Sequence, residues 1–315
     1  MSERALDVLV LLHERESRQG PPSHRIHALV ALWREAGLHV AFAHGPREAP
    51  KAHVVIPHVD LTHRPVGHDA WLGRQPAVLN RSVLDLSKRR VSTNLLQRDD
   101  AWSGPVVVKT DLNFGGHPEL RLLGRHGLLG RWARRRPKRW TSARWWPSHE
   151  YPVFENLRAV PPEVWSNPRW VVERFLPERE GEGEAYALRT WTFLGAAGAC
   201  VRRVGPRAIV KPAHGDPTTE VDVPPEVAAR RRELGIDYGK LDFVVNDEVG
   251  VVVLDANATP GLPPGPEVLA RRALDVALAR ALAPWLPADR SAQLQSLLDG
   301  SDQVGVEGLG ATLGP

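Results

Sequence analysis

Apolar and polar residues alternate in short blocks over the first 80 residues. Runs such as LDVLVLL and AHVVIPHV have the composition of buried strands. Between them, SHRIHALVALWREAG carries apolar residues at helical spacing, with Ser23 as a candidate N-cap and Gly37 as a stop signal. Strands that alternate with a helix predict a parallel sheet, whose ligands bind at the carboxyl ends of the strands.

The pattern changes after Ala77. GPVVVKTDLNFGGHPEL predicts a strand followed by a glycine loop, RWVVERFLPERE a strand that ends in acids, and EAYALRTWTFLGAAGACVRRV two strands joined at LGAAG. GPEVLARRALDVALARALAPWL has helical periodicity, and the glycine-rich end of the chain predicts a loose tail. The expected fold class is therefore α/β at the N-terminus and α+β beyond it.

A β-hairpin is expected at YGKLDFVVNDEVGVVVLDAN, because two β-branched runs flank a turn-type segment. If Asp247–Gly250 form the loop, Asn246 pairs with Val251. The same register then places Asp242 opposite Asp255.

Two acids and an amide consequently share one face of the hairpin. Asn257 lies two residues after Asp255, and strand side chains alternate between faces. Opposed Cβ atoms are about 4.5–5.5 Å apart, so like charges there are destabilising without a cation. A hard divalent cation would neutralise Asp242 and Asp255, whereas two solvent-facing acids on a surface hairpin are the alternative.

Composition places few limits on function. The 315 residues are 42% hydrophobic and 25% charged, as in ordinary globular proteins. The single cysteine, Cys200, excludes an internal disulfide, and its apolar strand suggests inert core. The N-terminal apolar run is too short for a signal peptide, and no run is long enough to span a membrane. A cytoplasmic location is the default expectation.

Positive charge is concentrated in residues 121–144. Nine bases and no acid occur between Leu120 and His149, and removing these bases takes the formal charge from +4 to −5. Tryptophans at 132, 140, 145 and 146 are interleaved with them. Nucleic acid, an acidic substrate, a membrane surface and an insertion whose tryptophans pack inward all stay open as explanations.

Lys109 ends the apolar run PVVVK and is followed by TDLNFGG. A lysine at this place can point its ammonium group at phosphate oxygens while loop N–H groups close over them. A lysine that snorkels out of a strand end is the alternative. The loop is not a Walker motif, because GxxxxGK[ST] is absent.

In this order, the lysine strand, the glycine loop, WVVERFLPE, the arginine-bearing strand pair and the Asp hairpin resemble the ATP-grasp superfamily. The resemblance covers about residues 78–285. LDANATPG is similar to the closing motif of D-alanine–D-alanine ligases and of the glutamate ligases that modify a ribosomal protein, and YALRTW is similar to a segment of the latter. The resemblance to this superfamily implies an N-terminal α/β domain (1–78), a small lobe (79–170), a large lobe (171–287) and a flexible tail (288–315).

The resemblance also implies roles for individual residues. Asp242, Asp255 and Asn257 match the positions that bind two Mg²⁺ ions, with Mn²⁺ as an alternative, although the second acid is more often glutamate in the family. The residues that match nucleotide-binding positions are Lys88, Lys109, the loop residues Thr110, Asn113, Gly115 and Gly116, the hinge residues Glu173, Arg174, Phe175 and Leu176, and Glu178 for the ribose. Arg89 or Arg90 could replace Lys88, and Glu180, Glu182 or Glu184 could replace Glu178. Arg189 and Arg203 are candidates for the catalytic contacts to the transferred phosphoryl group and the acyl-phosphate.

The implied activity is ATP-dependent carboxylate–amine ligation through an acyl-phosphate. The substrates would be small-molecule or peptide carboxylates and amines, anionic ones included, and a homodimer is an open alternative. A kinase on the same scaffold, or a nucleotide- or nucleic-acid-binding protein without turnover, is also compatible. The spacing of His58, His63 and His68 argues against a three-histidine metal site, whereas His58 and Asp60 could line an acceptor crevice.

Overall fold

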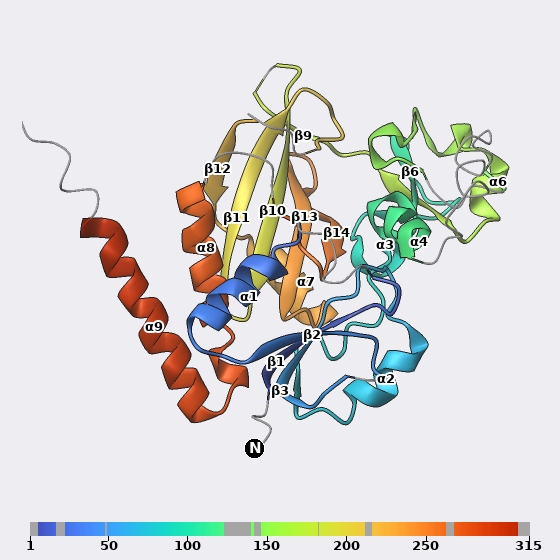
Figure 1. The fold of residues 1–315 in the computed structure, drawn as a ribbon. Coiled ribbons are helices and arrows are strands. Elements are labelled where there is room, and N and C mark those ends of the chain that lie inside the picture. Colours follow the sequence, from blue (N-terminus) through green and yellow to red (C-terminus); the bar gives the residue numbers. More distant parts are fainter. Residues whose placement is uncertain are drawn as a thin grey trace, which may run out of the picture.

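The computed structural model describes residues 6–16, 23–47, 49–122, 140–141, 146–181, 183–211, 216–262 and 268–307. Their strands form three sheets, one for each part of the molecule. In Figure 1 the small lobe stands beside the large-lobe sheet, and the N-terminal domain lies below both. Helix α3 (Lys88–Val91) and helix α4 (His117–Leu122) lie where these parts meet.

The N-terminal domain is a parallel α/β unit, as predicted. Its four strands run in the order β2-β1-β3-β4, with bounds Val40–His44, Leu6–Leu12, Ala52–Pro57 and Ala77–Val78. Successive β1 residues alternate between two cores: Val10 packs with helix α1 (Ile26–Glu35) and Leu11 with helix α2 (Val66–Leu72). Burial on both faces explains why β1 is apolar throughout.

Ser23 does not cap helix α1, contrary to the prediction. The helix starts at Ile26, and no side chain in the described ranges caps it. The preceding segment is instead bonded to a distant one: Arg25 N donates to Pro260 O at 2.9 Å, and Leu262 N donates to Ser23 O at 2.7 Å. The predicted stop at Gly37 is confirmed by its φ of 75°, a left-handed conformation that favours glycine.

The small lobe is built on an antiparallel sheet of order β5-β8-β6-β7, with bounds Leu95–Leu96, Trp170–Arg174, Val106–Thr110 and Val153–Phe154. Short helical turns accompany it: η1 (Asn113–Gly116), η2 (Ser148–Glu150), η3 (Leu157–Ala159) and α6 (Pro162–Trp165). Because β8 pairs with β6 through Arg174, this sheet extends four residues past the expected lobe boundary.

Two of the four interleaved tryptophans pack inward. Trp140 stacks on Trp146 with ring centroids 5.0 Å apart, and both contact Trp170 in the small-lobe core. Trp132, Trp145 and the bases from Arg125 to Arg144 lie outside the described residues. Of the nine bases, Arg121 is described, and it forms ion pairs with Glu16 and Asp60.

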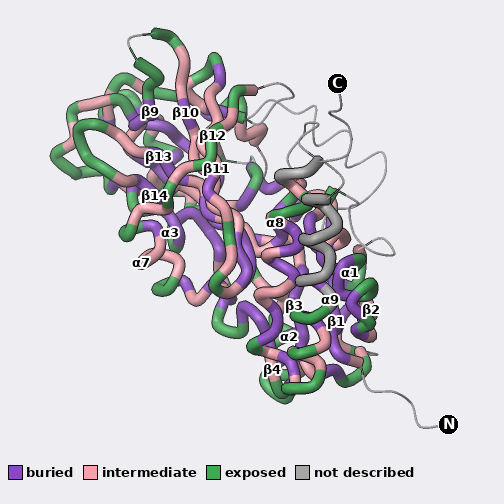
Figure 2. Tube along the Cα trace, turned by 90° about the vertical axis from the view of Figure 1, so that its left-hand side faces the viewer, coloured by how far each residue is buried: buried purple, intermediate pink, exposed green. Residues whose placement is uncertain are grey.

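The large lobe is an antiparallel sheet of order β12-β11-β10-β13-β14, with bounds Thr218–Val221, Ala197–Gly205, Tyr186–Leu194, Tyr238–Asn246 and Gly250–Asn257; strand β9 (Glu178–Arg179) pairs with β10. The predicted strand pair at LGAAG is β10–β11. Helix α7 (Pro225–Leu234) and helix α8 (Val268–Arg280) supply residues to two different cores of this sheet. The central strands are therefore partly buried, whereas the turn between β13 and β14 is exposed (Figure 2).

The β13–β14 hairpin has the predicted pairing of acids but not the predicted turn. Asn246 pairs with Gly250 rather than Val251, so the ladder starts one residue out of the expected register. A shift between Asp242 and Phe243 leaves Leu254 as an extra residue on β14. This β-bulge restores the register, and Asp242 lies opposite Asp255.

The last 28 residues are not a loose tail throughout. Helix α8 is followed by the short turn η4 (Ala283–Trp285) and then by helix α9 (Ala288–Glu307). Leu294 and Leu298 are one helical turn apart and buried in the same core as α1 and α8, which explains why this segment is helical. Among the described helices, none combines the length and apolarity that crossing a membrane requires.

Candidate functional site

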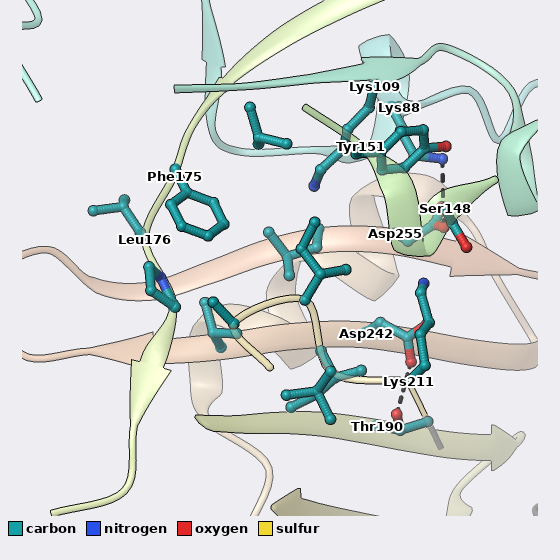
Figure 3. Close-up of a pocket in the computed structure, with 18 of the residues that line it drawn as sticks. Lys88, Lys109, Ser148, Tyr151, Phe175, Leu176, Thr190, Lys211, Asp242 and Asp255 are labelled. Atoms are coloured by element: carbon teal, nitrogen blue, oxygen red, sulfur yellow. Dashed lines mark hydrogen bonds and ion pairs between the residues drawn. The ribbon is translucent and has the colours of Figure 1, made fainter. Parts of the chain in front are cut away.

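A cavity of about 310 Å³ separates the small lobe from the large lobe. Its walls come from β6 and η1 on one side and from β10, β13 and β14 on the other. The two ends differ chemically. Figure 3 shows Phe175 and Leu176 at one end and the Asp242–Asp255 pair at the other.

The apolar end forms a slot lined by hydrophobic side chains. Val107 and Leu176 face it from the small lobe and the hinge, and Leu188, Val244 and Leu254 face it from the large-lobe sheet. The hinge is held in place because Phe175 N donates to Pro105 O at 2.9 Å. An apolar slot beside a hinge suits a heteroaromatic base.

Both aspartates at the polar end have a lysine partner. Lys240 Nζ lies 2.8 Å from Asp242 Oδ2, and Thr190 Oγ1 donates to Asp242 Oδ1 at 2.7 Å. Burial alone would raise the pKa of Asp242, but these donors hold that pKa below its usual value.

Asp255 is held more loosely. Lys88 Nζ lies 3.5 Å from Asp255 Oδ2, while it donates to Leu112 O at 2.8 Å. Although burial opposes it, Asp255 raises the pKa of Lys88, so this lysine stays charged. The sequence suggested a metal ion as the neutralising charge. In the structure, the ammonium groups of Lys240 and Lys88 lie beside the two aspartates.

Asn257 connects the polar end with the N-terminal domain. Its Oδ1 accepts from Thr259 N at 2.6 Å. The Thr259 hydroxyl lies 2.8 Å from Asn257 Oδ1 and 3.0 Å from Asp60 Oδ1. His58 is buried, and its Nε2 lies 3.1 Å from His24 Nδ1. Asp60 is therefore linked to Asn257 through the Thr259 hydroxyl. His58 is buried in the N-terminal domain.

Lys109 projects from β6 toward the cavity and pairs with Glu173 on β8. Their Nζ and Oε2 atoms are 2.6 Å apart, and the Glu173 side chain is fully buried. Among the described residues, the second carboxylate oxygen of Glu173 has no hydrogen-bond partner. A buried carboxylate fixes the direction of the Lys109 side chain, so the lysine enters the cavity from the small lobe.

The glycine loop joins all three parts of the molecule. Asn113 N donates to Thr62 Oγ1 at 2.9 Å, and Asn113 Nδ2 donates to Ala256 O at 3.0 Å. Trp146 N donates to Gly115 O at 3.0 Å. Phe114 has a φ of 45° and is 60% exposed at the cavity. An exposed aromatic residue in the left-handed region is a strained feature typical of functional loops.

The remaining predicted loop and hinge residues support the walls. Gly115, Arg174, Phe175 and Leu176 line the cavity, whereas Thr110, Gly116 and Glu173 lie behind it. The Thr110 hydroxyl lies 2.9 Å from that of Tyr151, which does line it.

Arg189, Arg203 and Glu178 lie outside the cavity lining. Glu178 is engaged by Arg189 and Arg202 through bonds of 2.7–3.1 Å, and it also accepts from Val245 N at 2.8 Å. Arg203 lies 3.9 Å from Asp216. Glu178, the predicted ribose acid, therefore pairs with Arg189, a predicted catalytic residue. Neither side chain lines the cavity.

Lys211 and Lys240 were not anticipated. Figure 3 shows the Lys211 amine projecting toward Asp242. Protein around the amine lowers the pKa of Lys211 to about 8, against the opposing pull of Asp242 and Asp255, although the residue as a whole is exposed. Both lysines had a sequence signal: RAIVK repeats the apolar-run-plus-lysine pattern of PVVVK, and Lys240 shares a strand face with Asp242.

The polar end is chemically suited to a hard cation. Asp242, Asp255 and Asn257 offer carboxylate and amide oxygens on one face of the hairpin, which are the ligands that Mg²⁺ prefers. Within the described ranges, no cluster of three or more histidines, cysteines or acids could hold a metal by itself. A cation there would need further oxygen ligands, as phosphates provide.

Comparisons by sequence found no matching family model, and no curated protein matches. Two solved structures of the ATP-grasp ligase PsnB match over nearly their whole length; one is a complex with a phosphomimetic variant of a minimal precursor, Mg and ADP, and the other with the minimal precursor, Mg and ADP. One gives a TM-score of 0.52 at 12% identity over 90% of this chain and 99% of that one; the other gives 0.50 at 10% identity over 93% and 100%. The D-alanine–D-alanine ligase from Coxiella burnetii matches with a TM-score of 0.43 at 15% identity, covering 94% and 99%. The chain has the ATP-grasp fold.

Proposed function

We propose that this protein is an ATP-dependent ligase that joins a carboxylate to an amine through an acyl-phosphate. One observation carries the proposal: a single cavity combines an apolar slot with a cluster of four lysines and two aspartates. A base at the apolar end would direct its phosphates toward Lys88, Lys109, Lys211 and Lys240.

The side chains have complementary tasks in this reaction. The carboxylate oxygen of the first substrate attacks the γ-phosphorus, the bond to the ADP oxygen breaks, and an amine then displaces phosphate from the acyl carbon. Lys109 and Lys211 would neutralise the transferred phosphoryl group from opposite lobes, since such transfers depend on positioning and charge. Asp242, Asp255 and Asn257 would hold Mg²⁺, which would neutralise phosphate charge when bound.

Both peptides and small molecules deserve testing as carboxylate donors. The PsnB structures contain a minimal precursor or a variant of it, so the test should include larger substrates such as peptides as well as small molecules. The experiment that separates ligase from kinase measures ATP turnover with pools of amino acids, peptides and polyols. The masses of the products are then determined. A condensed product supports the ligase, whereas a gain of phosphate alone on a hydroxyl would identify a kinase.

Asp255→Asn is the matched negative control, because it retains the shape of the side chain and removes the charge that neutralises a cation. We expect turnover to fall by at least about a hundredfold, from the loss of several kcal/mol of charge stabilisation. Glu248→Gln, on the exposed hairpin loop, should retain full turnover. Absence of Mg-ATP binding by the unaltered protein in calorimetry would refute the proposal.

A further inference from the structure

Lys240 places a positive charge at the polar end of the cavity, beside Asp242. It lies two residues before Asp242 on β13, so both side chains leave the same face of the strand. The backbone at Lys240 is paired on both sides, with Thr192 of β10 and with Asn257 of β14. The strand is therefore fixed in the sheet, and the Lys240 side chain leaves it beside Asp242.

The two carboxylates differ in how closely hydrogen-bond donors approach them. Asp242 has a donor on each oxygen, the Lys240 ammonium at 2.8 Å and the Thr190 hydroxyl at 2.7 Å. Asp255 has its ammonium at 3.5 Å, and its Oδ1 accepts from the amide of the next residue at 3.1 Å. Its side chain is also more exposed, 28% against 18% for Asp242.

A cation that enters the site consequently meets unequal ligands. At Asp255 it competes with a long ammonium contact that has a second partner in Leu112 O. At Asp242 it must displace a short, charge-assisted bond or stand beside a fixed positive charge. Like charges a few ångströms apart repel strongly where water is scarce.

We propose that the site takes one divalent cation with the nucleotide, held mainly by Asp255. Lys240 supplies at Asp242 the positive charge that a second ion would bring. The inference rests on the proposed nucleotide-binding function and replaces the expectation of two ions with one ion and one ammonium group.

Metal stoichiometry tests the inference directly. Mn²⁺ is titrated into an equimolar complex of the protein with a non-hydrolysable ATP analogue, and free Mn²⁺ is followed by its paramagnetic resonance signal. The unaltered protein should bind one Mn²⁺ per complex. Lys240→Met should bind two, because Asp242 becomes available, and Lys240→Arg should again bind one.

The two acids should respond differently in the same titration. Asp255→Asn should lower the affinity for Mn²⁺ by at least about tenfold. Asp242→Asn should change this affinity by less than about threefold. Lys51→Met, at an exposed position outside the site, is the charge-matched control and should leave stoichiometry at one. Lys240→Gln replaces Lys240→Met if thermal unfolding shows that the latter does not fold.

Several results would overturn the inference. Two Mn²⁺ ions in the unaltered complex, one ion in both neutral Lys240 variants, or equal losses in the two Asn variants would each do so. In those cases nucleotide binding persists and the proposed function stands. Failure of the unaltered protein to bind the analogue at any Mn²⁺ concentration would remove the proposed function, and this inference with it.

Discussion

Lysine residues largely set the electrostatics of the cavity. The aspartates predicted to face each other do so, and each has its own ammonium partner. They are neither solvent-facing surface acids nor bare carboxylates that need a metal to fold. Buried acids are stable when paired and hydrogen-bonded, so the site can be preformed before a ligand arrives.

Lys211 should make nucleotide binding pH-dependent. The pKa of this lysine is lowered to about 8 by the protein around it, so it is charged below that pH and loses its proton above it. We expect Mg-ATP affinity to fall as the pH rises from about 7.5 to 9, by at most about tenfold per unit above this pKa. Calorimetry over this range checks the prediction.

Two variants separate Lys211 from other groups in that titration. Lys211→Arg keeps its charge and should remove the decline in affinity. Lys211→Met should bind weakly at every pH in the range. A decline that persists unchanged in Lys211→Met would assign it to another group.

Gly115 should not tolerate a side chain. Its φ is 69°, and a Cβ there would lie 2.1 Å from the carbonyl oxygen of Trp146. Gly115→Ala should therefore cost about 2 kcal/mol or more of folding free energy and weaken nucleotide binding, because the loop must move. Urea unfolding and calorimetry measure the two effects.

Gly67→Ala is the matched control for this substitution. It lies in helix α2, and a Cβ there would have no neighbour within 4 Å in the part of the chain that the structure describes. Its free energy of unfolding should stay the same or rise by about 0.5–1 kcal/mol. Equal losses in the two variants would show that the Trp146 contact is unimportant.

At the scale of elements, strands β9, β10 and β11 are tied together by one acid. Glu178 on β9 binds Arg189 on β10 and Arg202 on β11, and its side chain is 6% exposed. Removing one partner of a buried ion pair leaves charges uncompensated, which is more costly than losing a surface pair. The geometry favours a structural role for Glu178.

Glu178→Gln tests this role against ribose binding. We expect a loss of about 3 kcal/mol in the free energy of unfolding and a change of less than threefold in nucleotide affinity. Burial raises the pKa of Glu178, but the arginines lower it overall, below 4.5. The loss should thus be present at neutral pH and shrink as the pH falls through that lowered pKa.

The exposed Glu184→Gln is the control and should match the unaltered protein in stability. If Glu178→Gln instead unfolds normally but binds nucleotide at least tenfold more weakly, then Glu178 contacts the ribose and the structural interpretation is wrong.

At the scale of the whole molecule, the glycine loop joins three domains through Asn113. Its backbone N–H reaches Thr62 in the N-terminal domain, and its side chain reaches Ala256 in the large lobe. Because Asn113 belongs to the small lobe and is buried, its bonds restrict how the lobes move relative to each other.

Asn113→Ala should loosen this junction. Losing one buried hydrogen bond should cost about 1–2 kcal/mol of stability and speed amide exchange in the loop from Asn113 to Gly116. Hydrogen exchange measured by mass spectrometry reports both. Asn246→Ala, which removes a hydrogen-bonding side chain from the exposed turn of the hairpin, should leave exchange in the glycine loop unchanged.

Much of the fold is local in origin and could be predicted for that reason. The parallel N-terminal sheet, the β10–β11 pair and the β13–β14 hairpin follow from apolar periodicity and turn residues. Ser23 and the C-terminal segment were misjudged because partners far away in the chain decide them. Ser23 O accepts a hydrogen bond from Leu262 N, and Leu294 and Leu298 pack into the N-terminal core.

The sequence by itself determined the chemistry that is available. It carries Lys109 after a strand, a glycine loop, and two acids and an amide on one face of a hairpin, because spacing along a strand dictates facing. Only the tertiary structure decided which charges meet. The bulge at Leu254 aligned Asp242 with Asp255, the sheet placed Arg189 on Glu178, and the fold brought Lys88 and Lys211 to the aspartates, because contacts between distant segments depend on packing that no local pattern encodes.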